Sequence, residues 1–185
     1  MNPLVITPTL GRSTHLREAV GSVAEVGAPV RHVLVCPTSE ATRLAREFPG
    51  TEVIGDDAPG VYAAICRGLQ VDGDWDAWTW LNDDDRWHSS GVRRAIEVMG
   101  HRPEVDVVYG KVAFVDRTGR FLGYLPVARD PDLLRPLMSM GVAAMSQQGT
   151  FARRRLLGEV GTLDRSYRLA ADFDWWARAV VGARR

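Results

Sequence analysis

Cysteine is scarce in this chain of 185 residues, and long apolar runs are missing. Only Cys36 and Cys66 occur, so a framework of disulfide bonds is not expected and a reducing cytosol is the natural setting. No stretch approaches the roughly 18 consecutive apolar residues of a membrane-spanning helix, and the N-terminal residues do not show the charged region and long apolar stretch typical of a signal peptide. These absences predict a soluble, cytoplasmic protein without a membrane span.

An excess of either charge is also missing, because Lys and Arg number 23 and Asp and Glu number 23. This balance argues against a nucleic acid or an anionic membrane recognised through bulk charge. Internal repeats and low-complexity segments are absent as well. A chain of this length with 45% apolar residues can bury a real core, and it fits a single domain, residues 1–185.

The first hundred residues alternate between short apolar runs and helical periodicity. Strands are expected at residues 3–7, 32–36, 51–54 and 77–82. Apolar residues at helical spacing, such as Leu16, Ala19 and Val23, predict a helix after each strand. This alternation requires parallel strands joined by crossover helices, hence a three-layer α/β sandwich in which ligands gather at the carboxyl ends of the strands.

The second half of the chain follows a different pattern. A long strand is expected at residues 105–115, and the turn at residues 116–119 leads into a partner strand at residues 121–127. A further strand is expected at residues 148–153, and a closing helix begins at about residue 171. The sequence therefore predicts a small antiparallel portion beside a mostly parallel central sheet.

Three consecutive carboxylates, Asp83, Asp84 and Asp85, follow the apolar run of residues 77–81. In an extended backbone Asp83 and Asp85 would point the same way, roughly 6–7 Å apart at Cα. Two aligned carboxylates form half of an oxygen cage for Mg²⁺ or Mn²⁺, which can neutralise a bound diphosphate. The alternative is a polar strand terminus that caps the next helix or lies in solvent.

Six short segments, in their order and spacing, are similar to motifs of the family 2 glycosyltransferases. They are VITPTLGR (residues 5–12), GVYAAICRGL (60–69), WLNDDD (80–85), VVYG (107–110), QQGTFARR (147–154) and ADFDWWAR (171–178). Each segment alone is weak, but together they span nearly the whole chain. The resemblance implies the Rossmann-like GT-A fold and an inverting transfer of sugar from a nucleotide sugar to a hydroxyl acceptor.

The resemblance also implies roles for individual residues on the donor side. Pro8, Thr9 and Arg12 would line the nucleotide pocket near the base and ribose. Gln148, with its neighbour Gln147, matches residues that reach the diphosphate or the acceptor. Residues 1–100 would form the nucleotide-sugar-binding half, with a UDP-sugar as the default donor, and residues 101–185 would form the acceptor-binding half.

The carboxylates carry the remaining implied roles. Asp83 would approach the donor ribose and, with Asp85, ligate Mn²⁺ or Mg²⁺ in the family's DXD motif, whereas Asp84 would be a neighbour in the donor site. Asp172 matches the position of the catalytic base. Its alternative role is simply that of a helix N-cap, which Asp fills well.

Several positions leave alternatives open. Leu10 stands where the family commonly has an aromatic residue, and Cys36 ends a strand that often ends in Asp. These departures favour an unusual donor, or a catalytically weak nucleotide-sugar-binding module that acts with a partner subunit or as a homo-oligomer.

Trp87 or Trp175 would border the acceptor site or else pack in the core. A nucleotidyltransferase is disfavoured, because the loop after the first strand is poor in glycine.

Overall fold

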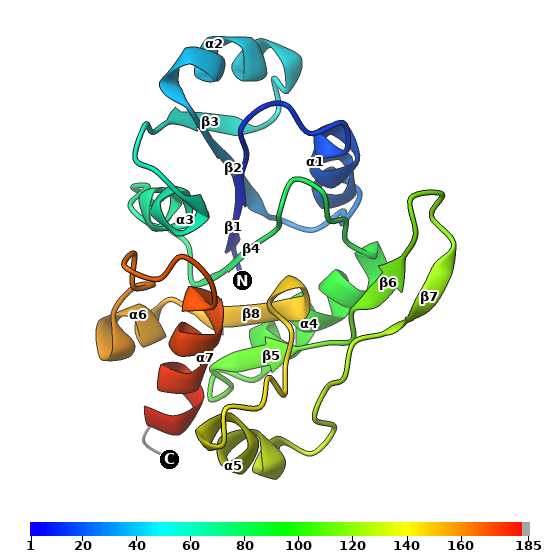
Figure 1. The fold of residues 1–185 in the computed structure, drawn as a ribbon, viewed down its shortest axis with the longest axis vertical. Helices are drawn as coiled ribbons and strands as arrows, with labels where there is room; N and C mark the ends of the chain where they lie inside the picture. Colours follow the sequence, from blue (N-terminus) through cyan, green and yellow to red (C-terminus); the bar gives the residue numbers. More distant parts are fainter. Residues whose placement is uncertain (183–185) are drawn as a thin grey trace.

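Six strands form the central sheet of the protein, described for residues 1–182 by a computed structural model (Figure 1). The strand order is β3-β2-β1-β4-β8-β5. The strands are β1 (Pro3–Pro8), β2 (Arg31–Cys36), β3 (Glu52–Gly55), β4 (Ala77–Trp80), β5 (Val107–Tyr109) and β8 (Thr150–Arg153). The first four run parallel and β8 runs antiparallel to both of its neighbours, which confirms the predicted mostly parallel α/β sheet.

Helices cover both faces of this sheet because successive side chains of each strand point to opposite faces. In β1, Leu4 and Ile6 pack into one apolar cluster with α3, α6 and α7, whereas Val5 packs into another with α1 and α4. The helices are α1 (Leu16–Ala24), α2 (Thr38–Glu47), α3 (Val61–Gly68), α4 (Ser89–His101), α5 (Leu134–Ser139), α6 (Arg155–Val160) and α7 (Ala171–Gly182). Short 3₁₀ turns span Pro131–Leu133 and Gln147–Gly149.

The single long strand expected at residues 105–115 is instead two strands in two different sheets. β5 lies at the edge of the central sheet, whereas β6 (Ala113–Val115) pairs with β7 (Phe121–Tyr124) in a separate antiparallel ribbon. The backbone leaves the central sheet at Gly110, whose N–H donates to the carbonyl of Gly149 at 2.9 Å. The ribbon is the small antiparallel portion that the sequence predicted.

A cluster of four tryptophans joins β4 to α7. Trp78 and Trp80 stack against Trp176 with ring centroids 6.2 and 6.0 Å apart, and Trp175 meets Trp78 edge-on at 4.8 Å. Such aromatic contacts add to the stabilisation from burial alone. The cluster fixes the start of α7 beside the carboxyl end of β4.

All six tryptophans of the chain are buried. Trp87 is 8% exposed and Trp175 is fully buried, so neither offers a ring to an acceptor sugar. Both side chains instead pack in the core, which was the alternative prediction, because each ring fills space between the sheet and a helix.

None of the helices between residues 1 and 182 has the length together with the apolar composition that a bilayer crossing requires.

Candidate functional site

The loops that follow β1 and β4 meet at the carboxyl edge of the sheet. Parallel pairing sets Ile6 opposite Trp80, so Thr9 and Asp83, each three residues further on, come together. The Thr9 hydroxyl donates to Oδ2 of Asp83 at 2.5 Å, and the Ser13 hydroxyl donates to the carbonyl of Asp83 at 3.0 Å. Two of the predicted site residues are therefore in direct contact.

The carboxylate triplet forms a turn and does not continue the strand. β4 ends at Trp80, and the N–H of Asp85 donates to the carbonyl of Asn82 at 3.1 Å. The expectation that Asp83 and Asp85 align along an extended strand is therefore wrong. Asp83 faces the loop after β1, whereas a carboxylate oxygen of Asp85 accepts a hydrogen bond from the Asn82 amide at 3.2 Å.

Asp85 is half-buried, and its environment disfavours a bare negative charge. Burial raises the pKa of the Asp85 carboxyl, and the neighbouring charge of Asp84 raises it further. Hydrogen bonds from Asn82 and Gln148 oppose this shift in pKa. A cation next to Asp85 would offset both the burial and the repulsion between the carboxylates.

Gln147 and Gln148 play different parts. Gln147 is buried, and its amide donates to the carbonyl of Trp80 at 2.5 Å, which ties the 3₁₀ turn before β8 to the end of β4. This tether holds Gln148 beside Asp85. Of the two glutamines, Gln148 is thus the one whose side chain reaches the carboxylates.

The carboxylates at this edge of the sheet supply only part of what a divalent cation requires. Among residues 1–182, no three His, Cys, Asp or Glu side chains converge as a complete metal cage. His88, three residues after Asp85, is exposed, and its ring lies 3.0 Å from the Ser90 hydroxyl. Mg²⁺ is usually held by one or two carboxylates together with waters and substrate phosphates. Asp83 and Asp85 fit a cation that arrives with a diphosphate.

Asp172 lies within the first turn of α7 and not at its cap. The N–H of Asp174 donates to the carbonyl of Ala170, so the helix begins before Asp172. The hydroxyl of Tyr62 in α3 lies 3.4 Å from Oδ1 of Asp172. Burial and the Asp172 charge both raise the pKa of the Tyr62 phenol, so it stays a hydrogen-bond donor to the carboxylate.

The backbone just before α7 is strained. Ala170 has a φ of 64°, and it is the only non-glycine residue with a positive φ in the described chain. A side chain in this left-handed region costs about 1 kcal/mol or more, and such strain often persists at functional sites. The strained residue lies two positions before Asp172.

The expected nucleotide pocket contains an acid that the sequence interpretation missed. Asp57, in the loop after β3, accepts a hydrogen bond from the N–H of Thr38 at 2.9 Å, and this bond lowers the pKa of its carboxyl. The N–H of Asp56 donates to the carbonyl of Cys36 at 2.8 Å. The loop after β3 thus brings an acid, Asp57, close to the end of β2, which itself ends in Cys36.

The remaining predicted residues lie along the loop after β1. Pro8 is buried at the end of the strand, whereas Leu10 is 68% exposed and Arg12 is exposed. Gly11 has a φ of 72°, and its carbonyl accepts a hydrogen bond from the Arg43 guanidinium at 2.6 Å. The loop is thus anchored to α2 and to Asp83, and it presents Leu10 and Arg12 outward.

Comparisons with known proteins bear on this site. No protein-family model matches the chain. Among curated proteins, the PGL/p-HBAD biosynthesis glycosyltransferases of Mycobacterium tuberculosis and Mycobacterium bovis are 30% identical to it over 183 residues. The match covers 92% of this chain and 66% of each relative, so the chain spans just under two thirds of the relatives' length.

Among solved structures, TarS of S. aureus has a similar fold. The crystal structure of TarS residues 1–349 aligns with a TM-score of 0.73 at 18% identity, over 100% of this chain and 57% of that one. The same fragment in complex with UDP-GlcNAc gives a TM-score of 0.69 at 16% identity, over 96% of this chain and 54% of that one. At these identities the likeness shows the fold alone.

Proposed function

We propose that the chain is a family 2 glycosyltransferase of the GT-A fold and transfers a sugar from a nucleoside diphosphate sugar to a hydroxyl acceptor, as its likeness to named glycosyltransferases supports. The observation that carries the proposal is the gathering of carboxylates at one edge of the sheet. Asp83 and Asp85 follow β4, and the tryptophan cluster holds the start of α7, which contains Asp172, beside the same strand. UDP-sugar is the default donor, because a fold neighbour was solved with UDP-GlcNAc.

The donor would bind along the loops after β1, β3 and β4. Pro8 shapes the end of β1, Thr9 holds the Asp83 carboxylate, and Arg12 offers an exposed guanidinium for a phosphate. Asp84 is exposed beside them, and its charge adds to the attraction for a cation. The amide of Gln148 would orient the carboxylate of Asp85 toward the diphosphate.

Asp83 and Asp85 would hold a divalent cation. When bound, Mn²⁺ or Mg²⁺ would supply Lewis-acid stabilisation of the charge that develops on the leaving diphosphate. The raised pKa of the Asp85 carboxyl supports this assignment, since a cation there compensates a half-buried negative charge.

Asp172 would act as the general base. Its carboxylate takes the proton from the acceptor hydroxyl while that oxygen attacks the anomeric carbon, and the bond to the diphosphate breaks on the opposite face. This single displacement inverts the configuration of the sugar. The Tyr62 hydroxyl bonded to Oδ1 leaves the second oxygen of Asp172 free for the proton.

The test combines nucleotide binding with turnover. Calorimetry with UDP, GDP and TDP, with and without Mn²⁺, identifies the base, and hydrolysis of the matching sugar nucleotide reports catalysis. We expect Asp85→Asn to abolish metal-dependent binding. Asp172→Asn should keep binding and lower turnover by about 10²–10⁴-fold, the range of general-base catalysis. Exposed Asp132→Asn is the control.

The outcomes separate the two functions considered. Full turnover in Asp172→Asn would rule out its role as the base. Nucleotide binding without turnover in the unmodified chain would support a catalytically weak nucleotide-sugar-binding module that acts with a partner subunit or a second copy. The exposure of Leu10, where an aromatic side chain is common in the family, favours this second reading of the donor pocket.

The setting of the reaction is part of the proposal. Cys36 and Cys66 are free and buried, and burial raises the pKa of both thiols. Unpaired thiols of this kind favour a reducing compartment such as the cytoplasm.

A further inference from the structure

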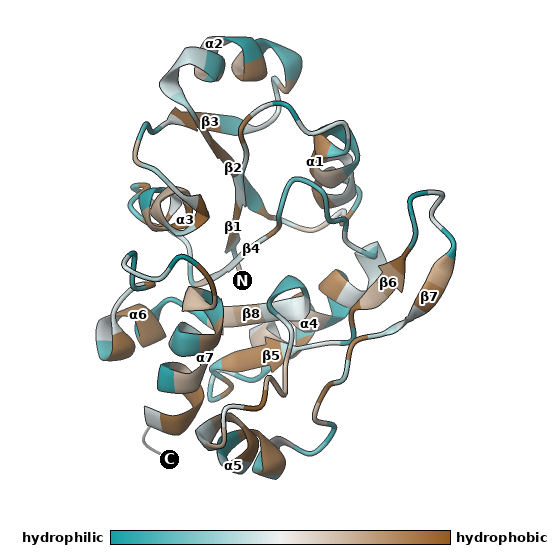
Figure 2. Ribbon diagram, in the orientation of Figure 1, coloured by the Kyte–Doolittle hydropathy of each residue, from teal (hydrophilic) through white to brown (hydrophobic). Residues whose placement is uncertain are grey.

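Exposed apolar side chains are concentrated on the β6–β7 ribbon. Twelve large apolar side chains are exposed in residues 1–182, and five of them belong to this ribbon of residues 111–124: Phe114, Val115, Phe121, Leu122 and Tyr124. Their exposed fractions range from 44% to 63%. In Figure 2, β6 and the first part of β7 are coloured as hydrophobic, the end of β7 is pale, and the turn between the strands is hydrophilic. Exposed apolar side chains gathered on one short ribbon indicate an interaction site.

The ribbon has no partner within the described chain. β6 and β7 pair only with each other, and the pair projects from the α/β body (Figure 1). An isolated two-stranded ribbon is marginally stable in water. Its internal contacts are few: the rings of Phe121 and Tyr124 lie 4.9 Å apart, and Nζ of Lys111 lies 5.2 Å from the Tyr124 ring centre. A surface that covers the apolar side chains would stabilise it.

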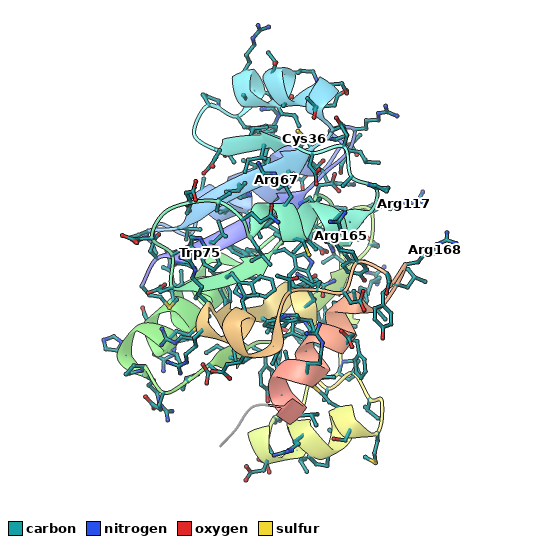
Figure 3. The ribbon with its side chains drawn as sticks, turned by 90° about the vertical axis from the view of Figure 1, so that its left-hand side faces the viewer. Cys36, Arg67, Trp75, Arg117, Arg165 and Arg168 are labelled. Carbon is teal, nitrogen blue, oxygen red and sulfur yellow. The ribbon has the colours of Figure 1, made fainter. Side chains whose placement is uncertain are left out.

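The charge of the ribbon identifies the kind of partner. Residues 111–124 contain three cations, Lys111, Arg117 and Arg120, against one carboxylate, Asp116. Asp116 is engaged by Thr118 and by the N–H of Arg120, at 2.6–3.0 Å. None of the three cations takes part in an ion pair within residues 1–182, and Arg117 reaches out from the edge of the molecule (Figure 3).

We propose that the β6–β7 ribbon docks this protein on a lipid bilayer that contains anionic lipids. The apolar side chains enter the boundary between head groups and acyl chains, while Lys111, Arg117 and Arg120 reach the lipid phosphates. A second copy of the chain fits less well, because a symmetric contact would bring the same cations together. The balanced charge of the whole chain conceals this local excess of cations.

The ribbon also lies next to the carboxylate loop. A side-chain carbon built at Gly119, in the turn of the ribbon, would lie 3.7 Å from the Arg86 guanidinium, and Arg86 directly follows Asp85. A bilayer bound to the ribbon would therefore lie close to the Asp83–Asp85 turn. The inference rests on the surface alone and does not depend on the proposed transfer reaction.

Vesicle sedimentation with the full chain tests the proposal. We expect the protein to sediment with an equimolar mixture of phosphatidylcholine and phosphatidylglycerol, more than with phosphatidylcholine alone, and to be released by salt. Phe114→Ser with Phe121→Ser removes apolar contact, and Arg117→Glu with Arg120→Glu reverses the charge. Each pair should weaken binding by about tenfold or more.

Matched controls carry the same chemical changes elsewhere on the surface. Leu133→Ser with Met140→Ser replaces apolar side chains that are 51% and 69% exposed, and Arg46→Glu with Arg135→Glu reverses exposed cations on α2 and α5. Both should bind vesicles like the unmodified chain. Circular dichroism shows whether each variant folds. If Phe114→Ser with Phe121→Ser does not fold, Arg117→Glu with Arg120→Glu alone tests the proposal.

Three results would overturn the proposal. The first is that the unmodified chain does not sediment with anionic vesicles. The second is that both ribbon variants bind as well as the controls. The third is a dimer, detected by analytical ultracentrifugation, that dissociates in Phe114→Ser with Phe121→Ser, because the ribbon would then be covered by a second copy.

Discussion

The tryptophan cluster and the β6–β7 ribbon are both rich in aromatic residues, yet they use them in opposite ways. Trp78, Trp80, Trp175 and Trp176 are at most 3% exposed, whereas Phe114, Phe121 and Tyr124 are at least 53% exposed. The cluster is enclosed between the central sheet and α7, while the ribbon strands pair only with each other. An aromatic side chain stabilises the fold where a helix or sheet covers it and remains available to a partner where none does, whatever the composition of its segment.

The comparison is tested most strongly by truncating one ring in each region. Trp175→Ala should lower the free energy of unfolding by about 3–5 kcal/mol, because it removes a fully buried ring. Phe114→Ala should change it by no more than about 0.5 kcal/mol, because that ring is 53% exposed. Urea unfolding followed by circular dichroism measures both. Equal costs would mean that the ribbon is part of the core.

A buried imidazole makes the stability of the central sheet depend on pH. Burial lowers the pKa of His32, whose ring lies 2.9 Å from the Thr7 hydroxyl, to about 4 from its ordinary 6.5. As the pH falls below 6.5, the unfolded chain binds a proton that the folded chain refuses until about pH 4. Stability is therefore fully present above pH 6.5 and is lost progressively toward pH 4.

The size of this effect is about 2 kcal/mol, allowing for the partial exposure of the ring. His32→Gln removes the titration, so the difference in unfolding free energy between the two proteins should shrink steadily from pH 7 to pH 4. Urea titrations at several pH values measure it. Parallel profiles for the two proteins would show that His32 is not the group responsible.

Within the cluster, hydrogen bonding separates two neighbouring rings. Nε1 of Trp175 donates to the carbonyl of Gly161 at 2.8 Å, whereas Nε1 of Trp176 is buried and has no partner among the described residues. Trp175→Phe leaves a carbonyl without its donor, but Trp176→Phe removes an unsatisfied group. We expect the first to cost about 1 kcal/mol more than the second. Thermal unfolding of the two variants, which match in size, measures the difference. A lower stability of Trp176→Phe than of Trp175→Phe would contradict the prediction.

Local patterns predicted most of the fold, whereas the roles of the carboxylates stay predictions. The parallel strands and their helices follow from the spacing of apolar residues, which depends only on near neighbours in sequence. The role of Asp172 follows from the resemblance of its local motif and stays a prediction. The turn at Asp83–Asp85 and the break at Gly110 could not be predicted, because Asp83 is bonded by Thr9 and Gly110 bonds to Gly149, each from a distant segment.

The missed residues depend on contacts between distant segments. In the sequence Tyr62 stood out only as part of the motif GVYAAICRGL, and its hydroxyl meets Asp172 across 110 residues of chain. Asp57 reaches Thr38 only because β2 and β3 pair in parallel, which sets Cys36 beside Gly55. The exposure of the ribbon could likewise not be predicted from the sequence, because alternating apolar residues predict a half-buried strand whether or not another surface covers that strand.

The smallest expected effect lies at Ala170, where the tryptophan-packed helix begins. Ala170→Gly should relieve the strain of a φ of 64°, although the greater freedom of glycine in the unfolded chain offsets part of the gain. We expect a net stabilisation of up to about 0.5 kcal/mol. Ala177→Gly, within the same helix, should instead destabilise by about 1 kcal/mol. Loss of stability in both variants would mean that contacts of the Ala170 methyl group outweigh the backbone strain before Asp172.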